Sequence, residues 1–243
     1  RVERRPAACD DFGMRAGARV HAFPDSARFG QRLARSLGVG CARVAVRHFP
    51  DGESLVRVRL PAGQHAILVR SLHQPNDKLV ETLLAADALR RAGARRVTLV
   101  APYLPYMRQD AVFAPGEALS QRVVGDCLAR AFDRILTLEA HLHRTRRLGD
   151  VTRGRAHSLS AAPVLARWVR RAAHGSLVVG PDEESEPWVR AIARAAGARW
   201  VVGQKDRLGD HHVRIRLPHL PAATHAVLVD DIASSGGTLA EAA

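Results

Sequence analysis

Cysteine, lysine, aromatic residues and long apolar runs are all scarce in this chain of 243 residues. The three cysteines, Cys9, Cys41 and Cys127, are odd in number and form no CxxC pair, which argues against a disulfide framework and a zinc site. No run approaches the ~18 apolar residues of a membrane span, and the N-terminus lacks the apolar stretch of a signal peptide. We therefore expect reduced thiols, a cytoplasmic location and no membrane partner.

Acidic residues are also fewer than basic ones, 24 against 37, which gives a formal net charge of +13. This charge would suit a nucleic-acid binder, but the arginines are spread through every segment and aromatic residues make up only 5% of the chain. Few surfaces are left for base stacking, so we expect no nucleic-acid partner. Of the 37 basic residues only Lys78 and Lys205 are lysines, which draws attention to each of them.

The apolar pattern predicts strands alternating with helices. Strands are expected at 18–23, 44–48, 55–60, 66–69, 97–100, 135–138, 177–179, 200–202, 213–217 and 226–229, and helices at 26–37, 76–92, 119–131, 160–173 and 187–196. In the helix at 76–92, Leu79, Val80, Leu83 and Leu84 are expected to face the core. The alternation indicates an α/β fold with mostly parallel sheets flanked by helices.

The same pattern divides the chain into segments. Residues 1–13 carry no periodicity and precede Met14, so we expect an unstructured extension there. Residues 14–155 form one expected domain. The strand and helix pattern restarts near residue 160, which predicts a second α/β domain over 156–243. The chain stops one turn into an expected helix, so this second domain is expected to be truncated at its C-terminus.

The last stretch carries the strongest candidate site. A buried strand, expected at 226–229, runs into Asp230 and Asp231, outside the carboxyl end where open α/β sheets hold ligands. The following turn consists of Ser234, Ser235, Gly236, Gly237 and Thr238. Its glycines and hydroxyls suit an anion at a helix start. A sugar phosphate fits this arrangement, with its hydroxyls on the aspartates and its phosphate on the turn. An ordinary strand, turn and helix with a serine N-cap is the alternative.

Other strand ends carry weaker candidates. His141 and His143 follow the strand at 135–138 and could share one cation or be purely structural. Asp182 is the first acid after the strand at 177–179, whereas the further acids up to residue 186 suit a helix N-terminus without any ligand. The connection at 102–120 is longer than usual, as functional loops often are.

The stretch from Asp230 to Thr238 resembles the phosphoribosyl diphosphate (PRPP) motif of phosphoribosyltransferases and of ribose-phosphate diphosphokinases, the PRPP synthetases. Resemblance to the second family extends from about Met14 to Ala243, with several motifs in the family's order. The family's Phe-x-(Asp/Asn)-x-Glu loop, which contributes to the ATP adenine site across a subunit contact, is matched by Phe49, Asp51 and Glu53. Its Tyr-x-Arg-Gln-Asp motif, in which Arg and Gln contact ATP, is matched at Tyr106, Arg108, Gln109 and Asp110.

The resemblance implies roles for further residues. His141 corresponds to a histidine associated with the metal and the ATP phosphates, and Asp182 to an aspartate of the metal and ribose phosphate site. Lys205 and Arg207 correspond to the Lys-x-Arg of a mobile catalytic loop. Asp230, Asp231 and Ser234 to Thr238 would hold ribose 5-phosphate. The chain departs from the family at Glu139 and Ser234, where aspartates are usual.

The implied fold is two tandem phosphoribosyltransferase-like domains. The implied reaction transfers diphosphate from ATP to ribose 5-phosphate with Mg²⁺ as cofactor, giving PRPP and AMP, in a homo-oligomer of at least two chains. A nucleobase phosphoribosyltransferase and a non-catalytic regulatory relative of the PRPP synthetases are the rival hypotheses. The Arg-Gln-Asp and Lys-x-Arg stretches speak against both.

Overall fold

A computed structural model describes residues 17–142, 144–207, 213–218, 225–233 and 236–243. The chain divides into two compact units. Unit 1 contains the described residues up to Leu138 together with Arg144–Ser158, and unit 2 contains Glu139–His143 and Leu159–Ala243. The expected extension at 1–13 lies outside the described residues. No helix in the described part of the chain is long and apolar enough to cross a bilayer.

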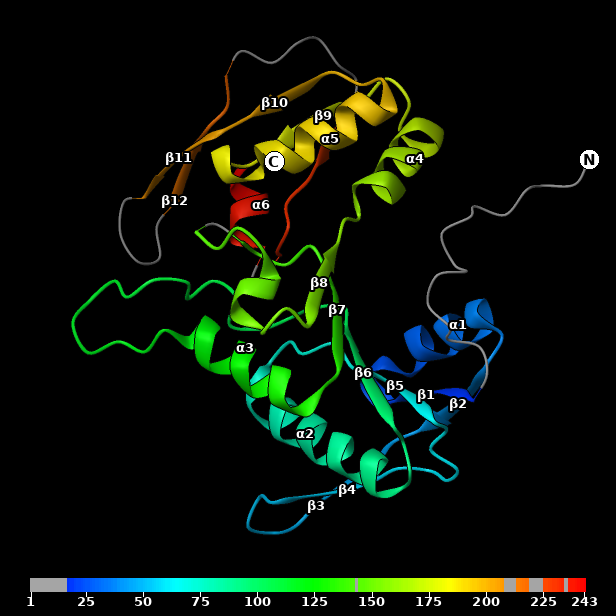
Figure 1. The fold of residues 1–243 in the computed structure, drawn as a ribbon. Helices are drawn as coiled ribbons and strands as arrows, with labels where there is room; N and C mark the ends of the chain where they lie inside the picture. The colour runs from blue at the N-terminus through cyan, green and yellow to red at the C-terminus, as the bar shows by residue number, and fades with distance from the viewer. Residues whose placement is uncertain (1–16, 143, 208–212, 219–224, 234–235) are drawn as a thin grey trace, which may run out of the picture. The chain divides into compact units, whose positions relative to one another are not determined.

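A six-stranded sheet in the order β2-β1-β5-β6-β7-β8 forms the centre of unit 1 (Figure 1). Its strands are β1 (Ala18–Ala22), β2 (Gly40–Arg43), β5 (His65–Val69), β6 (Arg96–Ala101), β7 (Arg134–Leu138) and β8 (Ala156–Leu159). The pairs from β2 to β7 are parallel. The central strand β5 is buried along its whole length, as expected for a parallel strand whose two faces are both covered.

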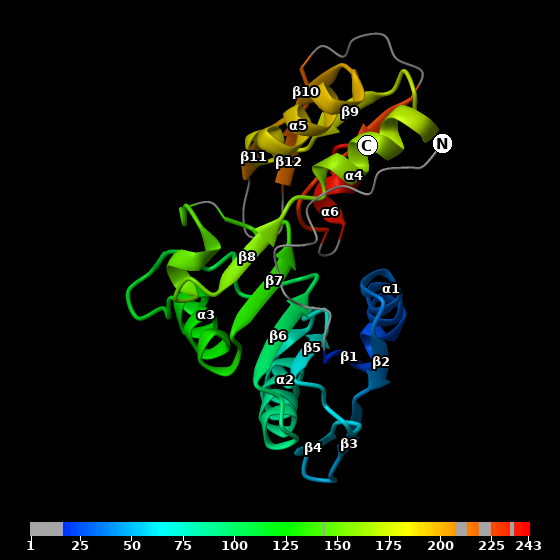
Figure 2. The same cartoon turned by 45° about the vertical axis from the view of Figure 1, so that its right-hand side comes forward.

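Three helices cover this sheet. The helix α1 (Ala27–Leu37) lies on one face, and α2 (Pro75–Arg91) and α3 (Ser120–Ala131) lie together on the other (Figure 2). From β1 the chain crosses to β2 on one side of the sheet, and its later strands add on the other side. The carboxyl ends of β1 and β5 therefore adjoin at the point where the strand order reverses, a common ligand position in open α/β sheets. Here that place holds an ion pair between Asp25 and Arg70.

A β-hairpin inserts between β2 and β5. Its strands β3 (Ala45–His48) and β4 (Ser54–Arg57) are antiparallel, with His48 opposite Ser54. The loop at 49–53 is closed by a hydrogen bond from the Phe49 N–H to the Glu53 carbonyl at 2.8 Å. Gly52 has φ +92°, which favours glycine at this turn position. The strands expected at 44–48 and 55–60 thus correspond to β3 and β4, although β4 is shorter than expected.

The buried face of α2 differs from the predicted one. Val80 and Leu84 are 55% and 41% exposed. The residues of α2 that are buried are Glu81, Thr82, Ala85, Ala86 and Leu89. The prediction was wrong for Val80 and Leu84 because apolar spacing assigns no inward place to a carboxylate. Glu81 is nevertheless buried, because its charge is paired with that of Arg70 at 2.5 Å.

Unit 2 contains a smaller parallel sheet in the order β10-β9-β13. Its strands are β9 (Leu177–Gly180), β10 (Trp200–Val202) and β13 (Ala226–Leu228), and its main helices are α4 (Ala162–Ala172) and α5 (Glu186–Ala196). The helices pack on a core that includes Val178, Val189 and Ile192. The strand β13 pairs in parallel as predicted, but it is an edge strand and Ala226 is exposed. The expectation of a fully buried strand was therefore wrong.

The remaining elements of unit 2 are an antiparallel pair, β11 (Gln204–Arg207) with β12 (Val213–Arg216), and the short helix α6 (Gly237–Glu241). Together the two units confirm the predicted α/β class with mostly parallel sheets flanked by helices. The division lies close to the expected boundary between residues 155 and 156, although the segment Glu139–His143 belongs to unit 2.

Candidate active site

Two adjacent carboxylates lie at the carboxyl end of β13. The N–H of Val229 donates to the Val179 carbonyl at 2.9 Å, which holds the end of the strand against the central strand β9. The chain then leaves the sheet at Asp230, whose carboxylate accepts a hydrogen bond from the Asp231 N–H at 2.9 Å. The Asp231 side chain is 7% exposed. The pair is therefore more enclosed than a surface turn, at a position typical of ligand binding.

The surroundings of Asp230 disfavour the ionised form of its carboxyl group. Burial raises the pKa of this carboxyl to about 6, the neighbouring Asp231 charge acts in the same direction, and Asp182 adds to it. The hydrogen bond from the Asp231 N–H opposes this rise. A ligand that brings hydroxyl donors or a cation would favour the ionised carboxylates. The electrostatics therefore suit a sugar or a metal ion better than a bare anion at these two side chains.

His141 contacts this carboxylate pair from a segment far away in the sequence. Its Nδ1 lies 2.6 Å from Oδ2 of Asp231. An ionised carboxylate can only accept, so Nδ1 carries the proton of this hydrogen bond. A carboxylate behind an imidazole fixes both its tautomer and its orientation, as in many metal and catalytic sites. The structure thus brings together His141 and Asp231, and His143 lies outside the described residues.

Glu139 anchors the segment that carries His141. Its carboxylate accepts hydrogen bonds from Ser160 Oγ at 2.7 Å, from the Ala161 N–H at 2.5 Å and from Trp188 Nε1 at 2.7 Å. Its backbone has φ +39°, a conformation that costs about 1–3 kcal/mol in non-glycine residues and needs such support. Glu139 thus supports the backbone that carries His141, a role that sequence reasoning missed although it named Glu139 as a departure from the family motif. The sequence signal that could have indicated this role is an acidic residue two positions before His141.

Asp182 lies at the end of the neighbouring strand β9. It is 6% exposed, and its carboxylate accepts from the Ser185 N–H at 3.2 Å, which caps the short 3-10 helix η4 (Glu183–Ser185). A side chain at Gly180 would collide with Ser185 Oγ, so glycine is required for this close turn. The ordinary role of Asp182 is therefore that of an N-cap. Its charge nevertheless reaches Asp230, which groups the two strand ends electrostatically.

The chemistry of these carboxylates fits Mg²⁺. This ion prefers oxygen ligands, keeps several waters and is commonly held by one or two carboxylates together with substrate phosphates. In the described part of the chain, no group of three or more His, Cys, Asp or Glu side chains is arranged to hold a metal. A magnesium ion shared with substrate does not need such a group. Burial is the main cause of the raised pKa of Asp230, the charges of Asp231 and Asp182 add to it, and a nearby cation would oppose the rise.

The predicted catalytic loop is partly a strand. Lys205 and Arg207 belong to β11, where Lys205 is opposite Ile215 and Arg207 is opposite Val213 on β12. The expectation that both residues lie in a loop was wrong because β11 and β12 satisfy each other's backbone groups. The base of this hairpin packs closely, since a side chain at Gly203 would meet the Pro181 carbonyl at 2.6 Å. Residues 208–212 lie outside the described residues.

The predicted phosphate turn is described in part. Gly236 has φ +80° and Gly237 begins α6, so glycine suits this entry to the helix. The backbone of Thr238 follows within α6. Ser234 and Ser235 lie outside the described residues, so their predicted roles stay predictions.

The predicted nucleotide residues occupy two segments of unit 1. In the hairpin loop, Asp51 Oδ1 accepts from the Glu53 N–H at 3.1 Å, and the Arg47 guanidinium lies 4.7 Å from the ring centre of Phe49. The exposed Arg108 and Gln109 lie in the long connection after β6.

Hydrogen bonds and an ion pair fix the long connection after β6 in place. Gln109 Oε1 accepts from Ser120 Oγ at 2.5 Å, and Asp110 is paired with Arg144 at 2.9 Å. Tyr106, which has φ +64°, donates from its hydroxyl to Asn76 on α2 at 2.5 Å. Among the described residues, no hydrogen bond or ion pair joins the hairpin loop to Arg108 or Gln109.

Parallel α/β units with paired carboxylates beyond a strand end, followed by a Gly-Gly turn, define a phosphoribosyltransferase-type α/β protein. Residues 19–131 match the family model described as the N-terminal domain of ribose phosphate pyrophosphokinase. The ribose-phosphate pyrophosphokinase of Methanopyrus kandleri is 35% identical over 228 residues, which cover 92% of this chain and 77% of that protein. That of Aeropyrum pernix is 34% identical, covering 88% of this chain and 71% of that protein.

The fold is also similar to a solved structure. The crystal structure of phosphoribosylpyrophosphate synthetase from Mycobacterium smegmatis matches with a TM-score of 0.77 and 26% identity, covering 93% of this chain and 75% of that one. The chain belongs to the ribose-phosphate pyrophosphokinase family, which is the diphosphokinase family that the sequence motifs resemble.

Proposed function

We propose that this chain transfers the β,γ-diphosphoryl group of ATP to the anomeric hydroxyl of ribose 5-phosphate. In this reaction the hydroxyl oxygen forms a bond to the β-phosphorus and loses its proton. The bond between the β-phosphorus and the oxygen that bridges to AMP breaks. The products are PRPP and AMP. Family membership makes the chain a transferase of diphosphate groups.

The observation that carries the proposal is the cluster formed by Asp230, Asp231 and His141. Two carboxylates at a strand end can each accept hydrogen bonds from ribose hydroxyls, and the raised pKa of Asp230 favours a ligand that donates to them. The phosphate of ribose 5-phosphate would bind the turn from Ser234 to Thr238. His141 is oriented by Asp231, so that it can contact the ATP phosphates as the family's histidine does.

The nucleotide side of the site would use both segments of unit 1. Arg108 and Gln109 would contact ATP, and Phe49, Asp51 and Glu53 would complete the adenine site of a neighbouring chain. The absence of a direct hydrogen bond between the two segments within the described residues is compatible with such sharing. The proposed active species is therefore a homo-oligomer of at least two chains.

Phosphoryl transfer depends mainly on positioning and on neutralising charge. Lys205 and Arg207 would supply positive charge to the migrating diphosphoryl group. Asp182, together with His141, would hold Mg²⁺ through its remaining shell of water and ATP oxygens. When bound, this ion would neutralise phosphate charge, whereas orientation of the ribose hydroxyl would rest on Asp230 and Asp231.

One assay tests the reaction. The protein is incubated with ATP, Mg²⁺ and ribose 5-phosphate, and the products are separated by ion-exchange chromatography. Equal amounts of AMP and PRPP are expected. Release of ADP or orthophosphate without PRPP, or no turnover at all, would contradict the proposal. A control with PRPP and free nucleobases distinguishes a nucleobase phosphoribosyltransferase, which would form nucleotides and diphosphate.

A further inference from the structure

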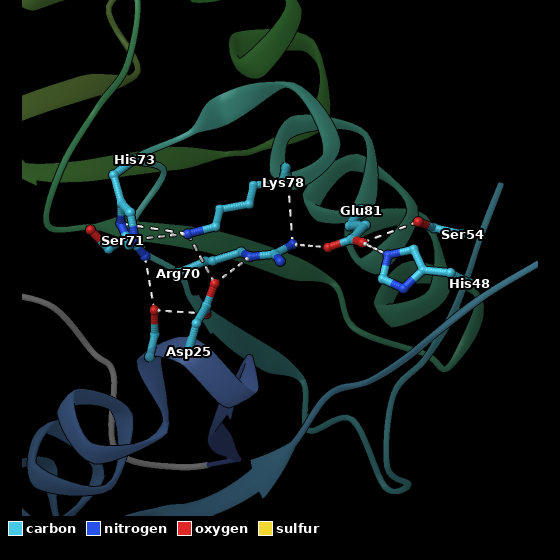
Figure 3. A network of polar contacts seen from close by, with 9 residues as sticks. Asp25, His48, Ser54, Arg70, Ser71, His73, Lys78 and Glu81 are labelled. Carbon is cyan, nitrogen blue, oxygen red and sulfur yellow. Dashed lines mark hydrogen bonds and ion pairs between the residues drawn. The ribbon is translucent and has the colours of Figure 1, made fainter. Parts of the chain in front are cut away.

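Glu81 is a buried carboxylate on α2 that the reaction described above does not use. Its side chain is 3% exposed, and both of its oxygens are engaged. Oε1 accepts from Ser54 Oγ at 3.0 Å and lies 2.8 Å from His48 Nε2. Oε2 is paired with Arg70 at 2.5 Å. Figure 3 shows Glu81 between Arg70 on one side and the two hairpin residues on the other.

The two hairpin partners of Glu81 occupy special positions. His48 is the last residue of β3, Ser54 is the first residue of β4, and the two are opposite each other in the register. They therefore flank the loop at 49–53, which carries Phe49, Asp51 and Glu53. One carboxylate oxygen thus contacts both ends of this loop. The loop itself contributes short-range bonds, but these do not attach it to the rest of unit 1.

Arg70 connects this carboxylate to the centre of unit 1. It follows the buried strand β5, and its guanidinium lies 3.9 Å from the ring centre of Phe23. It also pairs with Asp25 at 3.3 Å, and Lys78 pairs with the same Asp25 oxygen at 3.2 Å. Glu81 is therefore fixed by the buried network at the carboxyl ends of β1 and β5. The hairpin is attached to that network through one side chain.

We propose that Glu81 is a positioning residue that holds the loop at 49–53 in its nucleotide-binding arrangement. The inference rests on the proposed function, because it assigns the loop to the adenine site. Glu81 itself does not touch the substrate. It acts through His48 and Ser54, and its effect should be specific to ATP.

A carboxylate suits this position because it accepts from all three partners at once and carries the charge that pairs with Arg70. Arg70 and Ser54 donate, and His48 must donate from Nε2 because an ionised carboxylate only accepts. A glutamine of the same size offers one accepting oxygen and one donating NH₂ group. With its oxygen on Arg70, its uncharged NH₂ group faces the hairpin, where it bonds Ser54 and His48 only when these two turn from donating to accepting. Glu81→Gln therefore replaces the charge-assisted attachment of the hairpin by weaker neutral bonds, with little change in volume.

Two comparison variants separate positioning from general stability. Ser54→Ala removes one of the two hairpin bonds while leaving the pair between Glu81 and Arg70 intact. Leu89→Ala destabilises the same helix by leaving a cavity at a fully buried position eight residues after Glu81. A defect caused by loss of stability alone would be common to Leu89→Ala and Glu81→Gln. A positioning defect would be common to Glu81→Gln and Ser54→Ala.

The experiment measures the KM for ATP, the KM for ribose 5-phosphate and kcat, together with hydrogen–deuterium exchange of residues 45–57 in ligand-free protein. For Glu81→Gln we expect an ATP KM about tenfold higher, as for the loss of a charged hydrogen bond. The other two constants should stay within about twofold. Exchange of residues 45–57 should become faster. Ser54→Ala should change both readouts in the same direction by less, and Leu89→Ala should leave the ATP KM unchanged.

Several results would overturn the inference: an unchanged ATP KM, equal rises in both KM values, or unchanged exchange over 45–57 in Glu81→Gln. If Glu81→Gln does not fold, Ser54→Ala decides by the same criteria. An inactive parent protein would contradict the proposed function but not the positioning role. Exchange over 45–57 would then decide alone, with faster exchange supporting the role and unchanged exchange overturning it.

Discussion

At the scale of single residues, Asp231 has two tasks that one substitution can separate. Asp231→Asn keeps an oxygen that can accept from His141 Nδ1 but removes the negative charge. If the carboxylate binds ribose hydroxyls, the KM for ribose 5-phosphate should rise about tenfold or more, as expected for the loss of charge-assisted hydrogen bonds. The KM for ATP should change little. Steady-state kinetics with each substrate varied in turn measures both, and an unchanged dependence on ribose 5-phosphate would remove the assignment.

Glu81 makes the stability of unit 1 depend on pH. Burial acts to raise the pKa of Glu81, but hydrogen bonds from Arg70, His48 and Ser54 outweigh burial and leave this pKa below its ordinary value of 4.5. A carboxyl with a lowered folded-state pKa contributes stability that is complete above the ordinary value and is lost as the pH falls through the folded-state value. The difference in Tm between the parent and Glu81→Gln should therefore be largest above about pH 6 and shrink below 4.5.

Differential scanning calorimetry across this pH range measures that difference. Asp87→Asn is the matched control, because Asp87 lies on the same helix and forms an exposed pair with Arg91. Exposed pairs contribute little, so the Tm of this control should follow that of the parent at every pH. A difference between parent and Glu81→Gln that stays constant down to the lowest pH would show that the charge of Glu81 is not involved.

At the scale of elements, the hairpin formed by β11 and β12 carries Lys205 and Arg207, the two residues proposed to be catalytic. Lys205 and Arg207 lie in a two-stranded hairpin, where basic residues are also ordinary on a solvated surface. A charge used only in the transition state lowers kcat when it is removed and leaves ground-state binding intact. Lys205→Ala should lower kcat at least about 300-fold, near the lower end of what catalytic arginines contribute in phosphoryl transfer.

The matched control for this hairpin is Arg216→Ala, a basic residue on β12 whose register partner is Gln204. Its kcat should stay within about threefold of the parent's, and ATP affinity measured by calorimetry should be similar in all three proteins. If Lys205→Ala also retains kcat within about threefold, the hairpin is a solvated surface element and the catalytic assignment is wrong.

Some of these elements could be predicted from the sequence and others could not. The α/β class, the hairpin and the carboxylates beyond β13 could be predicted because apolar period, turn residues and strand-end chemistry are local signals. The buried face of α2 could not, since burial of Glu81 depends on Arg70 at the end of another element. The strand β11 was missed for a similar reason, because its polar residues are ordered by pairing with β12. The edge strand β8 was also missed.

At the scale of the whole molecule, the residues proposed for binding and catalysis are distributed over both units of the chain. The residues proposed for ribose 5-phosphate belong to unit 2, whereas those proposed for ATP belong to unit 1 except for His141, which belongs to unit 2. Within unit 1, the buried network between β1, β5 and α2 connects the hairpin loop to the sheet. A loop that its own chain holds in place is pre-organised for a neighbouring chain's site, which lowers the ordering cost of binding. The network around Glu81 therefore belongs to the same hypothesis as sharing of sites between chains.

If active sites are shared between chains, mixed oligomers should recover a definite fraction of the parent's activity. Glu53→Ala removes a loop residue and Lys205→Ala removes a catalytic residue, so each variant alone should be inactive. If every site takes its loop from one chain and its lysine from another, random equal mixing leaves about one quarter of the sites complete, because each of the two parts is intact half of the time. If each chain forms its site alone, no complete site arises. Activity of co-refolded oligomers, with mixing verified by two affinity tags, measures this fraction.

A second mixture tests the same prediction with both substitutions in one chain. The double variant carrying Glu53→Ala and Lys205→Ala is mixed equally with the parent protein. Shared sites again predict about one quarter of the parent's activity, whereas unshared sites predict about one half. The two mixtures should therefore agree at one quarter for shared sites and differ, at zero and one half, for unshared ones. This contrast holds for a dimer and for larger rings alike, because each site needs only one chain of each kind.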